Sequence, residues 1–407
     1  MRTPPPPPPP NNQYTRSTTL QVKMLSDQGC KEITLLGQNV NSYADFSHLQ
    51  AGLVAPPHLP RQALDPQTST NMETNADEDV FSAHYARGFR SVYRPHRDGS
   101  VTFAHLLDTV AQIDPEMRIR FTSPHPKDFS DDVLDVLQSR HNVCSQLHMP
   151  AQSGSTTVLD RMKRGYTRQA YNDLVARVRA CVPGVALSTD MIAGFCHETE
   201  EEHAESVDLL QRTRFDSAFL FAYSKREPTH AAKKYVDDVP QDVKARRLQE
   251  LIAVHRQGVV QAAEEEVGRR HLVLVEGVSR RSEAFLTGRT DTFKRVIFRD
   301  TFVSDGYFSA TQHGHSMVGG DLGGNVRVQP GEYVVVQVVA GGGGTLRGVA
   351  LARTTLQQFV SVHKSAVPLE TYDLHSLQSV MAGVYNERED GSANDVGGRL
   401  HASDVRL

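Results

Sequence analysis

The chain has 407 residues, of which 39% are hydrophobic, and its formal net charge is −4. This length and composition predict one large hydrophobic core and a second, small one. No apolar run approaches the length of a membrane-spanning helix, so we expect a soluble protein with no membrane partner. The small net charge indicates no anionic partner by itself, but residues 268–355 carry eleven Arg and Lys against seven Asp and Glu. That local excess favours a module that faces nucleic acid.

The four cysteines are Cys30, Cys144, Cys181 and Cys196. None of them forms a C-x-x-C or C-x-x-x-C pair, so the sequence predicts no zinc knuckle and no cluster-binding loop. So few cysteines in so long a chain do not indicate a disulfide framework, and they fit a reducing cell or organelle interior. We expect each to be an ordinary, small buried side chain.

Three segments have the composition of poorly structured chain. Residues 1–14 contain a proline run, and we expect a disordered leader because polyproline is extended and cannot join a sheet. Residues 46–99 are rich in Pro, His, Asp and Ser without a period, which indicates an insertion or a long surface loop. Residues 356–407 are polar and low in apolar residues, and we expect a disordered tail.

Residues 15–258 repeat a strand-then-helix pattern after a short helix over 15–28. Five runs have strand character, namely residues 30–37, 117–123, 146–150, 185–195 and 217–224. This alternation builds a parallel sheet with crossover helices. A complete barrel of this kind needs about eight units. The sequence therefore predicts an α/β fold with a partial (β/α) barrel, or a barrel whose beginning is missing.

Ligands of such sheets bind beyond the carboxyl ends of the strands. The polar loop at residues 151–155 and Asp190 near the end of the next strand therefore belong to one rim, where we expect the function. Asp190 lies inside an apolar run, where an unpaired carboxylate is costly. Its partner is expected to be either a cofactor hydroxyl or a barrel arginine such as Arg120.

The period changes to two after Gly268. Runs at residues 271–275, 294–298, 333–339 and 346–350 are separated by Gly-rich turns and predict a small all-β domain over residues 264–355. We expect a small antiparallel barrel of the oligonucleotide-binding type. Basic side chains of this domain are candidates for contacts with RNA phosphates: Arg280, Arg281, Arg289, Lys294, Arg295 and Arg347.

Seven stretches, in order along the chain, point to one family. They are LLGQNVNSY (35–43), RIRFTSPHPKDF (118–129), HMPAQSGS (148–155), MKRGYTRQAY (162–171), STDMIAGFCHETEEE (188–202), FLFAYSKREPTHAA (219–232) and DDVPQDVKARRLQEL (237–251). Together these stretches resemble the tRNA methylthiotransferases of the MiaB-like family, which are radical S-adenosylmethionine enzymes followed by a small RNA-binding TRAM barrel. FCHETEEE and the segment around DDVP are most similar to the eukaryotic, largely mitochondrial branch.

The resemblance implies 2-methylthiolation of N6-isopentenyladenosine next to the anticodon of tRNA. It implies S-adenosylmethionine and two 4Fe-4S clusters as cofactors, which supply the difficult chemistry while the protein positions the reactants. It also implies tRNA as the partner, a mitochondrial location (with the cytoplasm as the alternative) and a monomer, and leaves the sulfur donor unknown.

The family's two cysteine triads, one of them a C-x-x-x-C-x-x-C loop, precede the strand at Lys31, where this sequence has only the Pro-rich leader. We therefore expect a core without its first barrel strand and without cluster ligands. Cys30 is not expected to be a cluster ligand. Two further functions remain as alternatives. One is a non-catalytic RNA-binding or regulatory paralogue. The other is a metal-dependent hydrolase using His125, His148 and Asp190, which is disfavoured because His148 need not face the barrel lumen.

The resemblance also assigns site residues, because strand ends of the wider superfamily meet the cofactor. Amide, hydroxyl and imidazole groups there could accept or donate hydrogen bonds, and Arg226 could grip a tRNA phosphate. The predicted cofactor-binding residues are Gln38, Asn39, Ser123, His125, Gln152, Ser153, Asp190 and Tyr223.

Overall fold

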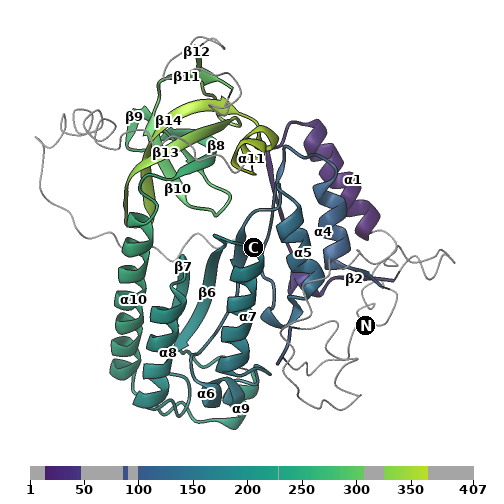
Figure 1. Cartoon of the computed structure of the whole chain (residues 1–407). Helices are drawn as coiled ribbons and strands as arrows, with labels where there is room; N and C mark the ends of the chain where they lie inside the picture. The colour runs from purple at the N-terminus through teal and green to yellow at the C-terminus, as the bar shows by residue number, and fades with distance from the viewer. Residues whose placement is uncertain (1–13, 47–85, 90–99, 228, 307–324, 365–407) are drawn as a thin grey trace, which may run out of the picture. The chain divides into compact units, whose positions relative to one another are not determined.

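The computed structural model describes residues 14–46, 86–89, 100–227, 229–306 and 325–364 (Figure 1). The predicted leader, most of the predicted insertion and the tail beyond residue 364 lie outside the described residues. Among the helices of the described segments, none combines the length and the apolar character needed to span a membrane.

All five strands predicted for the first domain are present and parallel. β1 (Glu32–Leu35) pairs with β4 (Arg118–Phe121), and β5 (Gln146–His148), β6 (Ala186–Ala193) and β7 (Ser217–Ala222) form a second parallel sheet in that order. Main-chain hydrogen bonds from Ile119 to Asn142 and from Cys144 to Ile119 continue β4 toward β5. The described residues thus contain a partial β/α core.

Helices accompany these strands, and α7, α8 and α10 lie alongside β6 and β7 (Figure 1). Thr167 caps α7, because its side chain accepts a hydrogen bond from the main-chain N–H of Ala170. The helices are α1 (Tyr14–Asp27), α4 (Phe103–Ala111), α5 (Asp131–Ser139), α6 (Thr156–Arg161), α7 (Arg168–Cys181), α8 (Glu200–Thr213), α9 (His230–Lys234) and α10 (Gln241–Glu264). The smaller elements near the insertion are β2 (Ala44–Asp45), β3 (Val101–Thr102) and the 3-10 turns η2 (Val40–Ser42) and η4 (Pro126–Asp128).

The β5–β6–β7 sheet has one covered face and one open face. Leu147, Leu187 and Met191 point to the covered face and are fully buried. Because side chains alternate along a strand, their neighbours point the other way. Phe219 and Phe221 on this open face remain 53% exposed. The open face is therefore available to a ligand or to a further part of a protein.

Residues 270–354 contain a seven-stranded sheet in the order β10-β9-β8-β13-β14-β11-β12. β10 also pairs in parallel with β14, so the pairings of β8, β9, β10, β14 and β13 run in a ring and the sheet is mixed rather than wholly antiparallel. Its core includes the fully buried Val273, Val296 and Val334. The strands are β8 (Arg270–Ser279), β9 (Ser282–Arg289), β10 (Arg295–Arg299), β11 (Phe302–Asp305), β12 (Asn325–Arg327), β13 (Tyr333–Gly342) and β14 (Thr345–Thr354).

The expectation of disorder from residue 356 needs a correction, because α11 (Leu356–Lys364) occupies the first part of that segment. The carboxylate of Glu116 accepts hydrogen bonds from the main-chain N–H groups of Leu356, at 2.6 Å, and Gln357, at 3.0 Å. Leu356 is buried in a cluster with Leu272 and other side chains of the small sheet. Two factors thus order this segment: the Glu116 carboxylate accepts hydrogen bonds from the first N–H groups of α11, and one apolar face of the helix is buried.

Candidate functional site

Four successive strands end in a left-handed residue at the same edge. These residues are Asn39 after β1 (φ 52°), Ser123 after β4 (φ 57°), Gln152 after β5 (φ 67°) and Gly194 after β6 (φ 73°). Non-glycine residues rarely adopt this conformation, which costs of the order of 1–3 kcal/mol each and tends to be kept where it serves a site. We call this edge the carboxyl rim.

The ends of β1 and β4 are joined at the rim. The main-chain N–H of Val40 donates to the carbonyl of Ser123 at 3.3 Å. The Asn41 side chain accepts from the main-chain N–H of His125 at 2.8 Å and donates to its carbonyl at 2.9 Å. The predicted pairs, Gln38 with Asn39 and Ser123 with His125, therefore lie together, and the side chains of Gln38, Asn39 and Ser123 are exposed.

His125 is held as a neutral imidazole. Its Nδ1 accepts a hydrogen bond from the main-chain N–H of Lys127 at 3.2 Å, so the ring proton of the neutral form lies on Nε2. Burial, reinforced by the positive charges of Lys127 and Arg164, lowers the pKa of His125 to about 4. At neutral pH the ring can therefore donate one hydrogen bond but carries no charge.

Gln152 and Arg164 connect the part of the rim at the ends of β1 and β4 with the part at the ends of β5 and β6. Arg164 donates to the Gln152 side-chain oxygen at 2.8 Å, and its charge acts on His125 across the rim. The Nε of Arg164 is buried and has no partner among the described residues. Arg164 is not among the residues predicted from the sequence, although it lies within the quoted stretch MKRGYTRQAY.

The position of Ser153 differs from that expected of a ligand-binding residue. Its side chain is buried, and its Oγ lies 3.3 Å from Oγ of Ser206 on α8. Ser206 also accepts from the main-chain N–H of Gly154 at 2.9 Å, and a Cβ at Gly154 would overlap the main chain of Glu205. The serine and glycine thus seat the loop against α8, whereas Gln152 remains at the rim.

Asp190 has a partner that the sequence analysis did not foresee. Its Oδ2 lies 3.3 Å from Nε2 of His148, and Nδ1 of that histidine lies 2.9 Å from Oγ of Ser188. His148 therefore faces the same side of the sheet as Asp190. The expected partner Arg120 instead pairs with Glu32 at 3.0 Å.

Tyr223 follows β7, and its main-chain N–H donates to the carbonyl of Ala193 at the end of β6, at 2.8 Å. Burial, together with Cys196, raises the pKa of Tyr223 to about 12, so its hydroxyl keeps its proton. The ammonium of the buried Lys244 lies 5.3 Å from the Tyr223 ring centre. Arg226 is exposed beyond this strand end.

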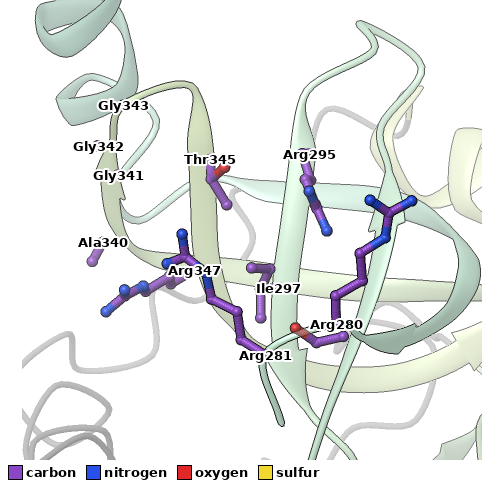
Figure 2. A pocket seen from close by; sticks show the side chains of 11 residues that line it. Arg280, Arg281, Arg295, Ile297, Ala340, Gly341, Gly342, Gly343, Thr345 and Arg347 are labelled. Atoms are coloured by element: carbon purple, nitrogen blue, oxygen red, sulfur yellow. The ribbon is translucent and has the colours of Figure 1, made fainter. Parts of the chain in front are cut away.

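Four of the six basic residues predicted for RNA contact line one pocket of about 560 Å³ (Figure 2). Arg280 and Arg281 come from the β8–β9 turn, Arg295 from β10 and Arg347 from β14, and the Gly341–Gly343 turn lines the pocket beside them. None of the described residues that line it is acidic. We call it the arginine pocket.

The other two basic residues lie outside the arginine pocket. Arg289 pairs with Glu276 at 2.9 Å, and Lys294 pairs with Glu266 at 2.6 Å. Each of these two cations is thus paired with an acid within the fold.

The described residues do not fit an iron–sulfur cluster. They contain no group of three or more His, Cys, Asp or Glu side chains that could hold a metal ion. Cys144 and Cys196 are buried, and burial raises the pKa of Cys144 to about 12. A cluster ligand must be a thiolate, which this environment opposes.

The model of the radical SAM superfamily matches residues 8–210. The parallel core is thus that of the radical SAM superfamily, to which the chain belongs. This membership implies S-adenosylmethionine and iron–sulfur chemistry.

Within that superfamily the chain is similar to tRNA methylthiotransferases, as its motifs indicated. The mouse protein named mitochondrial tRNA methylthiotransferase CDK5RAP1 is 48% identical over 337 residues, which are 83% of this chain and 50% of the relative. The human protein of that name is 46% identical over 335 residues, or 82% of this chain and 49% of the relative. A tRNA-2-methylthio-N(6)-dimethylallyladenosine synthase of Prosthecochloris aestuarii is 41% identical over 288 residues, or 70% and 54% of the two chains. The chain spans about half the length of these relatives.

Proposed function

We propose that this chain serves in the 2-methylthiolation of N6-isopentenyladenosine next to the anticodon of tRNA. The observation that carries this proposal is the carboxyl rim, where the ends of β1, β4 and β5 are strained. Polar side chains gather there from these strand ends and from the end of β7. The likeness to named methylthiotransferases, at 48% identity for the mouse protein, supports it.

The rim fits S-adenosylmethionine, which supplies a radical for hydrogen abstraction when it is bound. Gln152 offers its amide, and Arg164, whose Nε is buried without a partner among the described residues, offers positive charge for a carboxylate. Neutral His125 can donate one hydrogen bond from Nε2, and Asp190 can accept from hydroxyl groups. Gln38, Asn39, Ser123 and Tyr223 complete the proposed cofactor-binding set. The family's pair of 4Fe-4S clusters is part of the proposal. No ligands for these clusters are assigned among the described residues, which do not fit a cluster.

The RNA side of the proposal rests on the small sheet. We infer that residues 264–355 form the TRAM module, following a radical SAM core over 15–258, and that the arginine pocket binds tRNA phosphates. Four arginines around one pocket, with no acid among its described lining residues, suit a phosphodiester backbone. Arg226 is proposed as a further phosphate contact. We also propose action as a monomer and, from the names of the relatives, a mitochondrial location.

A second candidate function is RNA binding without catalysis. It is favoured by the contrast between a well-formed arginine pocket and the lack of any metal-ligand group among the described residues. The two functions share the tRNA and differ in the product.

One experiment separates the two candidates. The purified chain is treated with iron and sulfide under anaerobic conditions and given isopentenylated tRNA, S-adenosylmethionine and a reductant. Nucleoside mass spectrometry then measures the methylthio product, and filter binding measures the complex with tRNA. Product that disappears in Gln152→Ala supports the enzyme, binding without product supports the non-catalytic candidate, and neither binding nor product contradicts both.

A further inference from the structure

A second hollow lies next to the arginine pocket, on the other side of the β13–β14 turn. Its volume is about 330 Å³, at the lower end of the range of small-ligand pockets. Gly344 and Leu346 of the turn and of β14 line it, whereas Gly341–Gly343 and Thr345 line the arginine pocket. A chain of nucleotides that crosses the turn could therefore contact both.

Phe293, in the β9–β10 loop, is the aromatic wall of this hollow. Its φ is 66°, a genuine outlier for a bulky side chain, yet its side chain remains 42% exposed. The guanidinium of Arg289, a second lining residue, lies over the ring at 4.1 Å from its centre, and that of Arg120 lies over it at 4.8 Å. Because Arg120 is buried, Arg289 offers the accessible flat surface of this stack. Exposure of an aromatic ring in a strained conformation is not expected of a side chain that only fills a core.

Two buried arginines of β4 hold the loop that carries Phe293 in place. Arg120 donates to the carbonyls of Thr290, at 2.8 Å, and Asp291, at 2.7 Å. Arg118 donates to the carbonyl of Arg289 at 2.8 Å. The flat surface is therefore held in place before any ligand arrives, which lowers the entropy lost on binding.

The polar groups of the hollow suit a neutral ring better than a phosphate. Its cations are already paired: Arg289 with Glu276 at 2.9 Å, and Lys294 with Glu266 at 2.6 Å. Gln146 uses its side-chain oxygen for Arg120, and its amide N–H groups make no hydrogen bond within the described part of the chain. The exposed hydroxyl of Ser217 likewise has no such bond there. These groups can meet the edge of a nucleobase.

We propose that this hollow is a nucleobase pocket, which takes one unpaired base of the RNA whose phosphates lie in the arginine pocket. The base stacks on the Arg289 guanidinium that lies over the Phe293 ring, and its edge meets the Gln146 amide and the Ser217 hydroxyl. Bases bind in this way to aromatic rings and guanidinium planes. The inference rests on the RNA-binding part of the proposed function.

The test is the affinity of the full chain for a fluorescein-labelled anticodon stem–loop RNA, measured by anisotropy at several salt concentrations. Phe293→Ala is expected to weaken binding by about thirtyfold, the middle of the range for loss of one stacked base. Its salt dependence should stay that of the wild type, because no phosphate contact is removed. Phe293→Tyr keeps the ring and should keep the affinity.

A matched control is Phe302→Ala. Phe302 is also exposed, at 63%, and also stacks with an arginine of the small sheet, Arg327 at 5.2 Å, but it lines neither pocket. This variant should bind as the wild type does. In a series of stem–loops that each lack one loop base, we expect one RNA that the wild type and Phe293→Ala bind with equal affinity.

The outcomes distinguish the two proposals. If the wild type binds the RNA and Phe293→Ala binds as tightly as Phe302→Ala, the nucleobase pocket is wrong while RNA binding stands. If Phe293→Tyr loses as much affinity as Phe293→Ala, the ring is not a stacking surface and the pocket is again wrong. If the wild type binds no RNA, both the nucleobase pocket and the proposed RNA-binding function are wrong.

Discussion

Replacing Arg280 and Arg281 together by Gln removes two of the four positive charges of the arginine pocket while keeping side chains of similar length. Binding of a single-stranded loop releases about 0.7 counterions per neutralised phosphate. Four contacts therefore give a slope of about −2.8 in a plot of log affinity against log salt, and two contacts give about −1.4. Between 50 and 200 mM salt, the wild type should lose about fiftyfold in affinity and the variant about sevenfold.

Anisotropy titrations with the stem–loop RNA measure both slopes. The charge-matched control is Arg256→Gln with Arg299→Gln, two exposed arginines that line none of the pockets described above. This control should keep the wild-type slope. A slope that is unchanged in the pocket variant, or that falls equally in the control, would refute the assignment of phosphate contacts to the pocket.

Three further changes test how the fold supports the site. Arg247→Ala leaves the buried carboxylate of Glu198 without its partner at 2.9 Å, and urea unfolding should show a loss of about 3–5 kcal/mol. The NMR signal of His125 should not titrate between pH 8 and 5, because its pKa lies at about 4. This neutral form contributes stability above the unfolded-state pKa of about 6.5, and that contribution is lost as the pH falls from there toward 4. Glu116→Ala removes the cap of α11, and the free energy of unfolding should fall by about 1 kcal/mol, with faster amide exchange at Leu356.

Each of these expectations has an outcome that contradicts it. Arg246, an exposed neighbour of Arg247 that also pairs with Glu200, is the control for the first, and a loss as large in Arg246→Ala would contradict a special role for the buried pair. A midpoint near pH 6.5 for His125 would show that its ring is not held neutral by the rim. Unchanged exchange in α11 after Glu116→Ala would show that packing alone orders the helix.

The strands of the parallel core were predictable because each is an apolar run bounded by polar loops. Their polar ends were predictable too, since parallel strands place their carboxyl ends at one edge. The contact between His148 and Asp190 was not, because it depends on the register that sets His148 opposite Ser188. A change of register by one residue would turn His148 to the covered face.

The features that could not be predicted depend on contacts between residues far apart in the sequence. Glu116 caps a helix that begins 240 residues later, and no local pattern indicates that contact. Six basic residues of the small sheet were equivalent in the sequence. Only the fold separates the four that line the arginine pocket from Arg289 and Lys294, which pair with Glu276 and Glu266. The left-handed conformations of Asn39, Ser123 and Gln152 likewise follow from the tertiary structure, since none of these residues is glycine.

The most direct test of the carboxyl rim is hydrogen–deuterium exchange of the chain with and without saturating S-adenosylmethionine. The rim predicts slower exchange in four separate peptides, around residues 38–41, 123–125, 152–154 and 193–195, and no change around Phe302. Protection confined to one of these strand ends, or located away from all of them, would contradict a single ligand site at this edge of the sheet.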